Sequence, residues 1–256
     1  MSGGPMELFA LDSIPLVAAG DDLASLIVDG YETTGRAPED GDIVVIAQKI
    51  VSKAEGRHVD LRDVTPSAQA YELAGECDKN PRLVELILSE STAALRWRPG
   101  LLIVIHRLGM VLANAGIDSS NVGAGSDDQR VLLLPLDPDG TCRRLRWELA
   151  ERCGADVAVI INDSIGRAWR GGTVGTALGA AGVTVLDDLR GRPDLDGRHL
   201  DVSIQAVGDE LAAAASLLQG QADEGRPVVV VRGFSRAAPE APAATLVRPK
   251  DEDLFR

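Results

Sequence analysis

Three polar segments of the chain combine residue types that can handle an anionic substrate. The first is Gln48–Arg57, which follows the apolar run Asp42–Ala47 and carries Lys49, Lys53 and Arg57. Three cations at the end of a strand suit a phosphate or a carboxylate, and strand ends are where α/β folds bind ligands. A solvated basic turn fits the same residues.

The second segment, Asn114–Gly123, places Asp118 and Asn121 three residues apart among small neighbours. Small residues let a backbone approach a ligand closely. A carboxylate and an amide together can hold a hard cation or the edge of a purine. An Asx-type turn that closes a hairpin is an equal alternative.

The third segment, Asn162–Gly175, follows a short apolar run that predicts a strand. The pair Asp163 and Ser164 at the carboxyl end of that strand is well placed for a divalent metal. Arg167 and Arg170 have the forked geometry that clamps phosphate or carboxylate. A capped helix start with a solvated arginine pair is the alternative, but the coincidence of acid, base and glycine favours function here.

Apolar periodicity places strands and helices around these segments. Runs with period-two or continuous apolar character predict strands near Glu7–Leu11, Asp42–Ala47, Leu101–Ile105, Val131–Leu134, Val157–Ile161, Val183–Leu186 and Val228–Arg232, with a further strand-like stretch at His106–Ala113. Helical spacing predicts helices over Asp21–Asp29, from Asn80-Pro81 to Leu88, over Arg143–Cys153 and over Ser203–Leu218. The mixture predicts an α+β (mixed α/β) fold.

Glycine and proline mark the expected ends of several elements. Gly30 is expected to end the first helix. The stretch Gln219–Pro227 is explained locally as a turn in which Gly220 or Gly225 ends the last helix. The Ala/Pro-rich residues 237–245 predict a surface loop.

Composition excludes several classes of protein. The 256 residues carry a net charge of −13 and only 3% aromatic residues, which argues against nucleic-acid binding. The longest apolar runs are far shorter than the roughly 18 residues of a membrane helix, so no membrane partner is expected. No Lys or Arg precedes Arg36, and the three cysteines form no C-x-x-C, so a cytoplasmic protein with reduced thiols is expected. P-loop, dinucleotide-binding, H-E-x-x-H and G-x-S-x-G motifs are absent from the sequence.

Four segments, taken in order, resemble the coenzyme F420-0:γ-glutamyl ligase family. They are Ala47–Arg57, Gly116–Val122, Asn162–Thr173 and Gly220–Gly225, and the ending Arg248–Arg256 is also similar to that family. The resemblance spans nearly the whole chain. It implies one ligase unit over residues 1–256, an unusual two-part α+β fold with mixed sheets, and an intertwined homodimer without a C-terminal flavin-reductase-like domain.

The resemblance also implies a reaction. Family members use GTP to attach L-glutamate to the lactyl carboxylate of coenzyme F420-0, and then add a second glutamate through a γ-linkage. They require Mg²⁺ or Mn²⁺ and are stimulated by K⁺. Because a carboxylate is a poor electrophile, its activation as an acyl phosphate fits this chemistry. The alternatives are a ligase of the same family with another acceptor or amino acid, a non-catalytic nucleotide or deazaflavin binder, and a metal phosphatase.

Carried onto this chain, the family pattern implies two sets of ligand-binding residues. The nucleotide would be bound by Ile14, Pro15, Leu16, Val17, Gln48, Lys49, Lys53, Asn121, Gln219, Gly220, Gln221, Ala222, Asp223, Glu224, Gly225 and Arg226. One divalent cation would be held by Asp118 and Asp163, and a second by Ser164 and Gln221. Gln221 is neutral at a position where a carboxylate would bind a metal better.

The residue types suggest the catalytic roles. Lys53 would neutralise phosphate as a point charge, and Asp118 and Asp163 would share the metal that faces the phosphate oxygens. We further infer that Arg167 and Arg170 bind the phosphodiester of the acceptor or the incoming glutamate. This interpretation requires that Asp118 and Asp163, which are far apart in sequence, meet in the folded chain.

Overall fold

A computed structural model describes residues 5–119, 129–235 and 238–254. The strands are β1 (Glu7–Ala10), β2 (Ile43–Ala47), β3 (His58–Asp60), β4 (Ser91–Arg98), β5 (Leu101–His106), β6 (Val111–Ala113), β7 (Arg130–Leu132), β8 (Ala158–Arg167), β9 (Arg170–Ala181), β10 (Asp187–Asp188), β11 (Ile204–Gln205) and β12 (Val228–Arg232). The helices are α1 (Leu23–Thr33), α2 (Gln48–Ala54), α3 (Ala68–Cys77), α4 (Pro81–Ser89), α5 (Pro138–Cys153) and α6 (Val207–Gln219). Short 3₁₀ turns are η1 (Leu61–Asp63), η2 (Asn114–Gly116), η3 (Ala243–Leu246) and η4 (Lys250–Glu252). The expected α+β class is confirmed.

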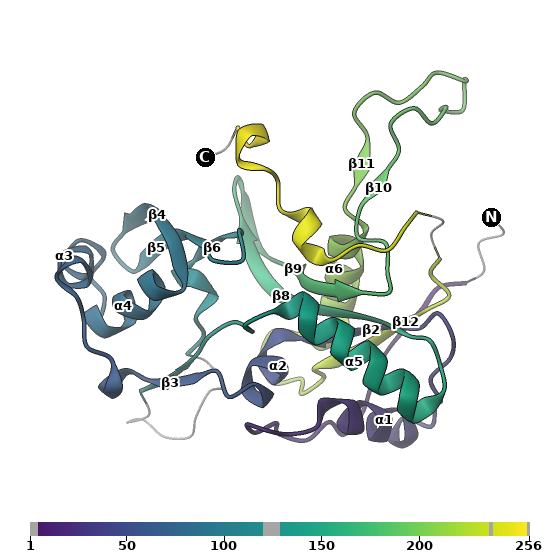
Figure 1. Ribbon diagram of the computed structural model, residues 1–256, viewed down its shortest axis with the longest axis horizontal. Coiled ribbons are helices and arrows are strands. Elements are labelled where there is room, and N and C mark those ends of the chain that lie inside the picture. The colour runs from purple at the N-terminus through teal and green to yellow at the C-terminus, as the bar shows by residue number, and fades with distance from the viewer. Residues whose placement is uncertain (1–4, 120–128, 236–237, 255–256) are drawn as a thin grey trace.

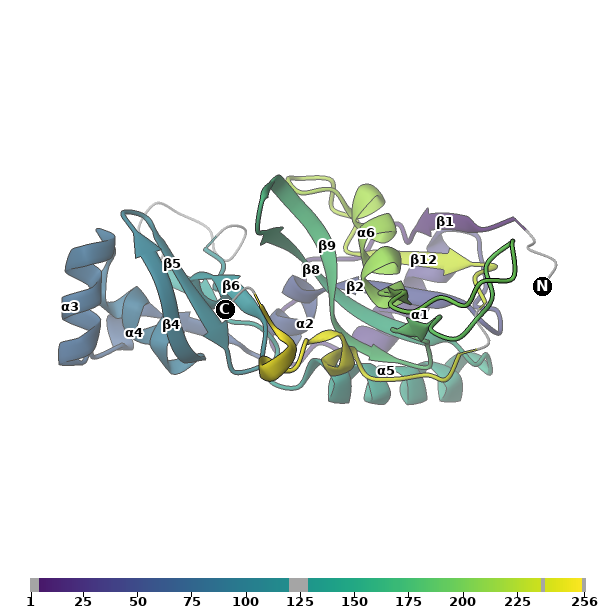
Figure 2. The ribbon, with the colours of Figure 1, turned by 90° about the horizontal axis from the view of Figure 1, so that it is seen from above.

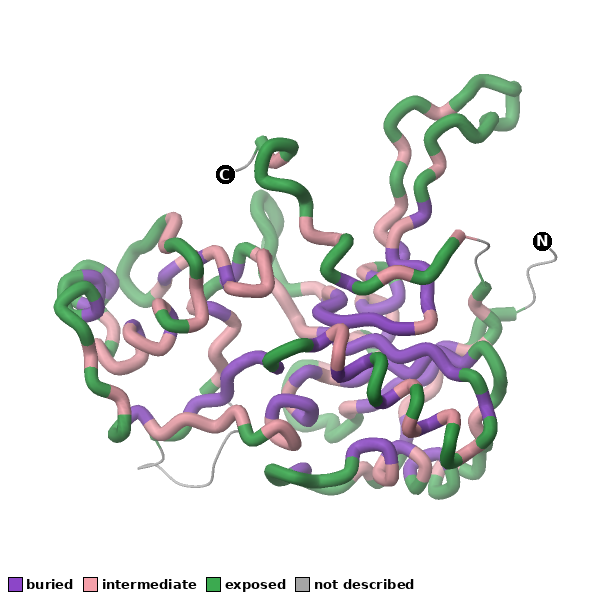
Figure 3. Tube along the Cα trace, in the orientation of Figure 1, coloured by how far each residue is buried: buried purple, intermediate pink, exposed green. Residues whose placement is uncertain are grey.

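A five-stranded mixed sheet organises the larger part of the molecule, which we call the large lobe (residues 5–57 and 133–254). Its order is β1-β12-β2-β8-β9, and only the β2–β8 pair is parallel. Helices α1 and α5 cover one face and α6 covers the other (Figure 1). The strands β2 and β12 are continuous aliphatic runs because both faces of the sheet are buried. Figure 3 shows the buried residues concentrated along this sheet.

The remaining described residues between 58 and 132 form a small lobe beside this sheet (Figure 2). Its antiparallel sheet β4-β5-β6 packs one face against α3 and α4, where Leu102 and Val104 contact Val84 and Ile87 in a separate core. Strands β3 and β7 pair with each other and connect the two lobes. A long arm, residues 187–205, projects from the large lobe and is mostly exposed.

Several expected elements have different bounds. Helix α1 continues through Gly30 to Thr33, because Gly30 faces the core: a Cβ at this glycine would lie 2.8 Å from Cδ1 of Ile14. Helix α5 begins at Pro138, with Asp137 as its N-cap. Gly220 does end α6, as expected, but that helix starts at Val207.

One expected strand is wrong. Residues Val183–Leu186 form no strand: Val183, Thr184 and Val185 are all buried, but β9 ends before Gly182, whose φ is +76°. The expected surface loop 237–245 is mostly exposed over residues 238–245, but its end enters η3, where Ala243 is buried. Residue 237 lies outside the described residues. Among the residues described, no helix has the length and apolar character needed to cross a membrane.

Candidate active site at the junction of the two lobes

Helix α2 supplies the cationic side of the candidate site. Strand β2 ends at Ala47 and the chain turns at once into this helix, so the expected basic loop is helical. Ile50 and Val51 pack into the core beneath it. Lys49 and Lys53 are four residues apart and therefore share the opposite helical face.

Asp118 follows a left-handed turn at the end of β6. Asn114, Ala115 and Gly116 have φ values of 50°, 55° and 66°. Non-glycine residues adopt this conformation at a cost, and runs of it are rare. The turn is held because Asn114 Oδ1 accepts a hydrogen bond from Leu102 N at 3.2 Å. After this turn Asp118 lies at the edge of β7, where its backbone N–H donates to Leu132 O at 3.0 Å.

Asp163 lies on β8, one residue beyond its parallel pairing with β2, which ends at Asn162. The whole stretch Asn162–Gly175, expected to be a loop or a helix start, is instead a long hairpin of β8 and β9. Alternation along β8 places Ile161 in the core on the α1 and α5 side of the sheet, so Asp163 shares that side. Helix α2 lies on the same side.

These three elements bring the expected charged residues together. Lys49 Nζ lies 2.7 Å from Asp118 Oδ2. Burial, with a further contribution from the negative charge of Asp118, raises the pKa of Asp163 to about 6, although Lys49 and the N–H of Ser164 act in the opposite direction. Burial and the charge of Lys49 lower the pKa of Lys53, while Asp118 opposes this shift.

The donor chemistry of this cluster fits a hard divalent cation. Asp118 and Asp163 come from different lobes, and their negative charges repel one another. Among its described hydrogen bonds, Asp163 accepts only the one from the Ser164 N–H, at 2.8 Å. Mg²⁺ is commonly held by one or two carboxylates together with substrate phosphates and waters. Within the described residues, no group of three or more His, Cys, Asp or Glu side chains forms a metal site. Two carboxylates therefore leave room for phosphate oxygens as further ligands.

The second pair of expected metal ligands lies on the other side of the hairpin. Ser164 is directly opposite Gly175, where an added Cβ would lie 2.3 Å from Ala212 O of α6. Ser164 therefore faces α6, whereas Asp163 faces α2. Gln221 is exposed just beyond the end of α6. The two expected pairs of metal ligands therefore lie on opposite sides of β8.

The expected nucleotide-binding residues differ in their accessibility. Gln48 is only 2% exposed, and its Oε1 accepts a hydrogen bond from Ser52 Oγ at 2.9 Å. Gln219 is tied to Asn162 by two hydrogen bonds of 2.8 and 3.1 Å. Both side chains are therefore held by hydrogen bonds inside the protein. The exposed positions in this set are Pro15, Leu16, Gln221, Ala222, Asp223, Glu224, Gly225 and Arg226, while Val17 is buried and Ile14 and Gly220 are partly buried. Asn121 lies outside the described residues.

Arg57 does not join the lysines with which the sequence groups it. Helix α2 ends before Gly56, whose φ is +67°. The chain turns there, and Arg57 donates to Leu134 O and to Glu90 Oε1, both at 2.9 Å. Glu90 also bonds Arg107, so Arg57 belongs to a joint between the lobes. The sequence contained no local signal for Glu90 in this role.

Arg167 and Arg170 form the end of the β8–β9 hairpin, on either side of the exposed Trp169. They are paired directly across the turn and are exposed. Both therefore lie on the same hairpin as Asp163, and Arg167 is four residues beyond Asp163 along β8.

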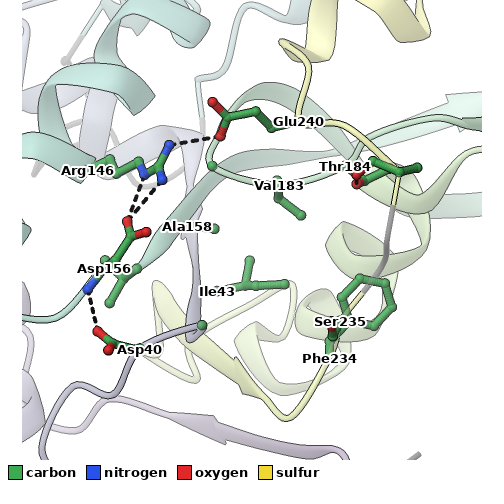
Figure 4. Close-up of a pocket in the computed structure, with 14 residues that line it drawn as sticks. Asp40, Ile43, Arg146, Asp156, Ala158, Val183, Thr184, Phe234, Ser235 and Glu240 are labelled. Carbon is green, nitrogen blue, oxygen red and sulfur yellow. Dashed lines mark hydrogen bonds and ion pairs between the residues drawn. The ribbon is translucent and has the colours of Figure 1, made fainter. Parts of the chain in front are cut away.

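A cavity of about 350 Å³ lies at the opposite end of the sheet (Figure 4). Ile43 and Ala158, at the starts of β2 and β8, line it. Arg146 spans its rim and bonds Asp156 at 3.0 Å and Glu240 at 2.9 Å. Because Lys49 follows the end of β2 and Asp163 lies beyond the β2–β8 pairing, this cavity is separate from the candidate site.

Comparison with known proteins gives a consistent result. The chain is 45% identical to the coenzyme F420:L-glutamate ligase of Methanothermobacter thermautotrophicus over 253 residues, covering 98% of this chain and 99% of that protein. It is also 45% identical to the ligase of the same name from Methanopyrus kandleri, covering 99% and 100% of the two chains, and 40% identical to that of Halobacterium salinarum, covering 98% and 96%. The family model described as F420-0:Gamma-glutamyl ligase matches residues 12–233. The residues of the charged cluster all lie inside this match. The chain therefore belongs to the F420-0:γ-glutamyl ligase family.

Proposed function

We propose that this protein is a GTP-dependent ligase that adds L-glutamate to coenzyme F420-0 and then a γ-linked glutamate to the product. It would act as a homodimer, with Mg²⁺ or Mn²⁺ and with stimulation by K⁺. The observation that carries the proposal is the meeting of Lys49, Lys53, Asp118 and Asp163 from three separate elements. The names of the relatives supply the acceptor and the amino acid.

The proposed chemistry has two steps. An oxygen of the acceptor carboxylate attacks the γ-phosphorus of GTP, the bond from that phosphorus to the β–γ bridging oxygen breaks, and GDP leaves. The amine of glutamate then attacks the acyl carbon, the C–O bond to phosphate breaks, and the nitrogen loses a proton to give the amide. Phosphoryl transfer of this kind depends on positioning and on neutralisation of charge more than on covalent protein chemistry.

The side chains of the site have distinct proposed tasks. Asp118 and Asp163 would hold the divalent cation, which supplies charge neutralisation at the phosphate oxygens when it is bound. Lys53 faces the same region as a mobile point charge for phosphate. Lys49, paired with Asp118, orients that carboxylate and limits the negative charge that a triphosphate meets. The exposed residues 221–226 and Leu16 offer surface for the nucleoside.

Mass spectrometry of the product tests the proposal most directly. The protein is incubated with F420-0, GTP, Mn²⁺ and glutamate, and GDP is measured in parallel. We expect F420-0 to gain one or two glutamyl residues, with one GDP formed per amide bond. GDP formation without acceptor would indicate a phosphatase, and binding without GDP would indicate a non-catalytic binder. A product formed only with another amino acid or acceptor would indicate a different ligase of this family.

A further inference from the structure

The small lobe presents one sheet face that no part of its own core covers. Along β5, the residues Leu102, Val104 and His106 are buried, while Leu101 and Ile105 are only partly buried. A continuous aliphatic strand is expected to be covered on both faces. Here α3 and α4 cover one face only, and the outer face keeps an apolar stripe partly open to solvent.

The register of the sheet shows what borders this stripe. Arg96 and Arg98 on β4 lie directly opposite Ile103 and Leu101 on β5. On the other side, Val111 of β6 lies opposite Ile105 and is 40% exposed. Directly opposed residues point to the same face. We call the resulting surface the outer sheet face: Arg96, Arg98, Leu101, Ile103, Ile105 and Val111.

The two arginines of the outer sheet face have no acidic partner among the residues that the structure describes. Neither Arg96 nor Arg98 forms an ion pair or a side-chain hydrogen bond within the described part of the chain, although the protein has a net charge of −13. Other arginines are tied to carboxylates, as Arg146 is to Asp156 and Glu240. Two unpaired guanidinium groups beside an apolar stripe fit a ligand that combines a flat apolar body with an anionic group.

The outer sheet face is next to the candidate active site. Strand β6 continues through η2 to Asp118, five residues after Ala113. Figures 1 and 2 show that α3 and α4 lie on one side of this sheet and that the β8–β9 hairpin lies on the other. That hairpin carries Asp163 near its base and Arg167 and Arg170 at its end. The open face is thus turned toward the hairpin that completes the charged cluster.

We propose that the outer sheet face is the acceptor subsite, which binds the deazaflavin ring and the phosphodiester of F420-0. The inference rests on the proposed function and deepens it. Leu101–Ile105 spans roughly 13 Å at about 3.3 Å per residue, enough to support a three-ring system lying across it. Arg96 and Arg98 bind the phosphodiester at the edge of the ring. The carboxylate to be activated is attached to this phosphodiester, and it would face the β8–β9 hairpin that carries Asp163.

Direct binding of two probes tests this subsite. One probe is F420-0, and the other is the ring-bearing riboside without the phospholactyl group. Binding of both is followed by deazaflavin fluorescence. Arg96→Gln with Arg98→Gln is expected to weaken F420-0 binding at least about tenfold, through loss of charge-assisted hydrogen bonds. The same variant should change riboside binding less than about twofold, which is within the range of a minor contact.

The apolar stripe is tested with a second pair of substitutions. Ile103→Thr with Ile105→Thr keeps the β-branched shape and is expected to weaken both probes by about tenfold, since each lost methyl contact removes about 0.8 kcal/mol or somewhat more. Matched controls on the projecting arm are Arg198→Gln and Val202→Thr, whose side chains are exposed. These controls should bind both probes like the unsubstituted protein. The KM for GTP should stay unchanged in all four proteins.

Three outcomes overturn the subsite. They are an arginine variant that binds F420-0 like the Arg198→Gln control, an arginine variant that weakens the riboside as much as F420-0, and variants whose oligomeric state changes in light scattering. The last result would make this face a contact between copies of the chain. Failure of the proposed function is distinct: the unsubstituted protein would then form no glutamylated product. Normal ligation with an unchanged KM for F420-0 in every variant would refute the subsite alone.

Discussion

Two aspartates, one just before β2 and one on the neighbouring strand β8, differ in the partners that their carboxylates have. Asp42, just before β2, is 1% exposed and accepts two hydrogen bonds of 2.7 Å from Arg232. Tyr31 Oη and the N–H of Glu39 also donate to it, each at 3.1 Å. Asp163, on β8, accepts the N–H of its own neighbour and forms no ion pair among the described residues.

The difference separates a structural carboxylate from one that is able to bind a ligand. The partners of Asp42 use its oxygen lone pairs, so the residue can contribute to stability but has nothing to offer a substrate. Asp163 keeps most of its acceptor capacity and sits beside a second negative charge, an arrangement that costs stability in the absence of a cation. Such costs are typical of functional sites.

The substitution Asp163→Asn should have the largest effect on activity. We expect the ligation rate to fall by about a thousandfold or more, comparable with the loss of a central electrostatic contact in other active sites. Stability at pH 7 should be unchanged or higher, because the variant lacks the poorly compensated negative charge. Product formation by mass spectrometry and urea denaturation measure the two effects. Retained turnover with Mn²⁺ would contradict the role of this carboxylate.

The substitution Asp42→Asn should have the reverse pattern. It removes the buried charged partner of the Arg232 guanidinium and leaves only the exposed Glu39, and removal of one member of a buried ion pair typically costs about 3–5 kcal/mol. We expect a loss of this size in urea denaturation, with nearly normal ligation by the folded fraction. The milder Tyr31→Phe removes one hydrogen bond and should cost about 1 kcal/mol. Equal stability of Asp42→Asn and Asp163→Asn would remove the contrast between the two sites.

The sequence predicts the strands of the central sheet better than the hairpin that carries Asp163. Aliphatic runs located β2, β8 and β12, and Asn80-Pro81 located the start of α4, because local patterns determine these features. The β8–β9 hairpin was missed, since its polar, glycine-rich strands lack alternation and its turn uses Trp169 at a φ of 67° in place of a usual turn residue.

The geometry of the site depends on contacts between distant segments. The sequence grouped Arg57 with Lys49 and Lys53, but Gly56 turns the chain and Glu90, 33 residues farther on, binds Arg57. Similarly, the side of β8 that Ser164 occupies follows from the packing of Gly175 against α6. Residue types indicated which chemistry is available, whereas the pairing of strands decided which residues share a surface.

Glu90 extends the comparison to a third carboxylate that is saturated with partners. Burial alone would raise its pKa, but His106, Arg107 and Arg57 outweigh burial and lower that pKa to about 2 from 4.5. We expect Glu90→Gln to cost about 3 kcal/mol at pH 7, since each pKa unit corresponds to about 1.4 kcal/mol.

The pH dependence tests the cause of this loss. The ionised Glu90 contributes fully above pH 4.5, and its contribution disappears as the pH falls from 4.5 toward 2, because the unfolded chain binds the proton first. The stability difference between the unsubstituted protein and Glu90→Gln should therefore shrink across this range in denaturation experiments. If this stability difference stayed constant with pH, the packing of the Glu90 side chain, and not its charge, would stabilise the contact between the lobes.

Gly116→Ala should produce the smallest effect and probes how rigidly Asp118 is aimed at Asp163. Gly116 has a φ of +66°, and an added Cβ would lie 3.0 Å from Cδ1 of Leu134 in the core. Strain in the left-handed region and this contact together predict a loss of about 1–2 kcal/mol in the free energy of unfolding.

The matched control is Gly75→Ala in α3, where a Cβ meets nothing within 4 Å and helix propensity predicts a gain of about 0.5–1 kcal/mol. Because Asp118 follows two residues after Gly116, the concentration of Mn²⁺ needed for half-maximal ligation should rise in Gly116→Ala and stay constant in Gly75→Ala. If Gly116→Ala lost stability without a change in this Mn²⁺ requirement, the left-handed turn would support the fold only, and Asp118 would be positioned by its bridge to Leu132 and its pair with Lys49.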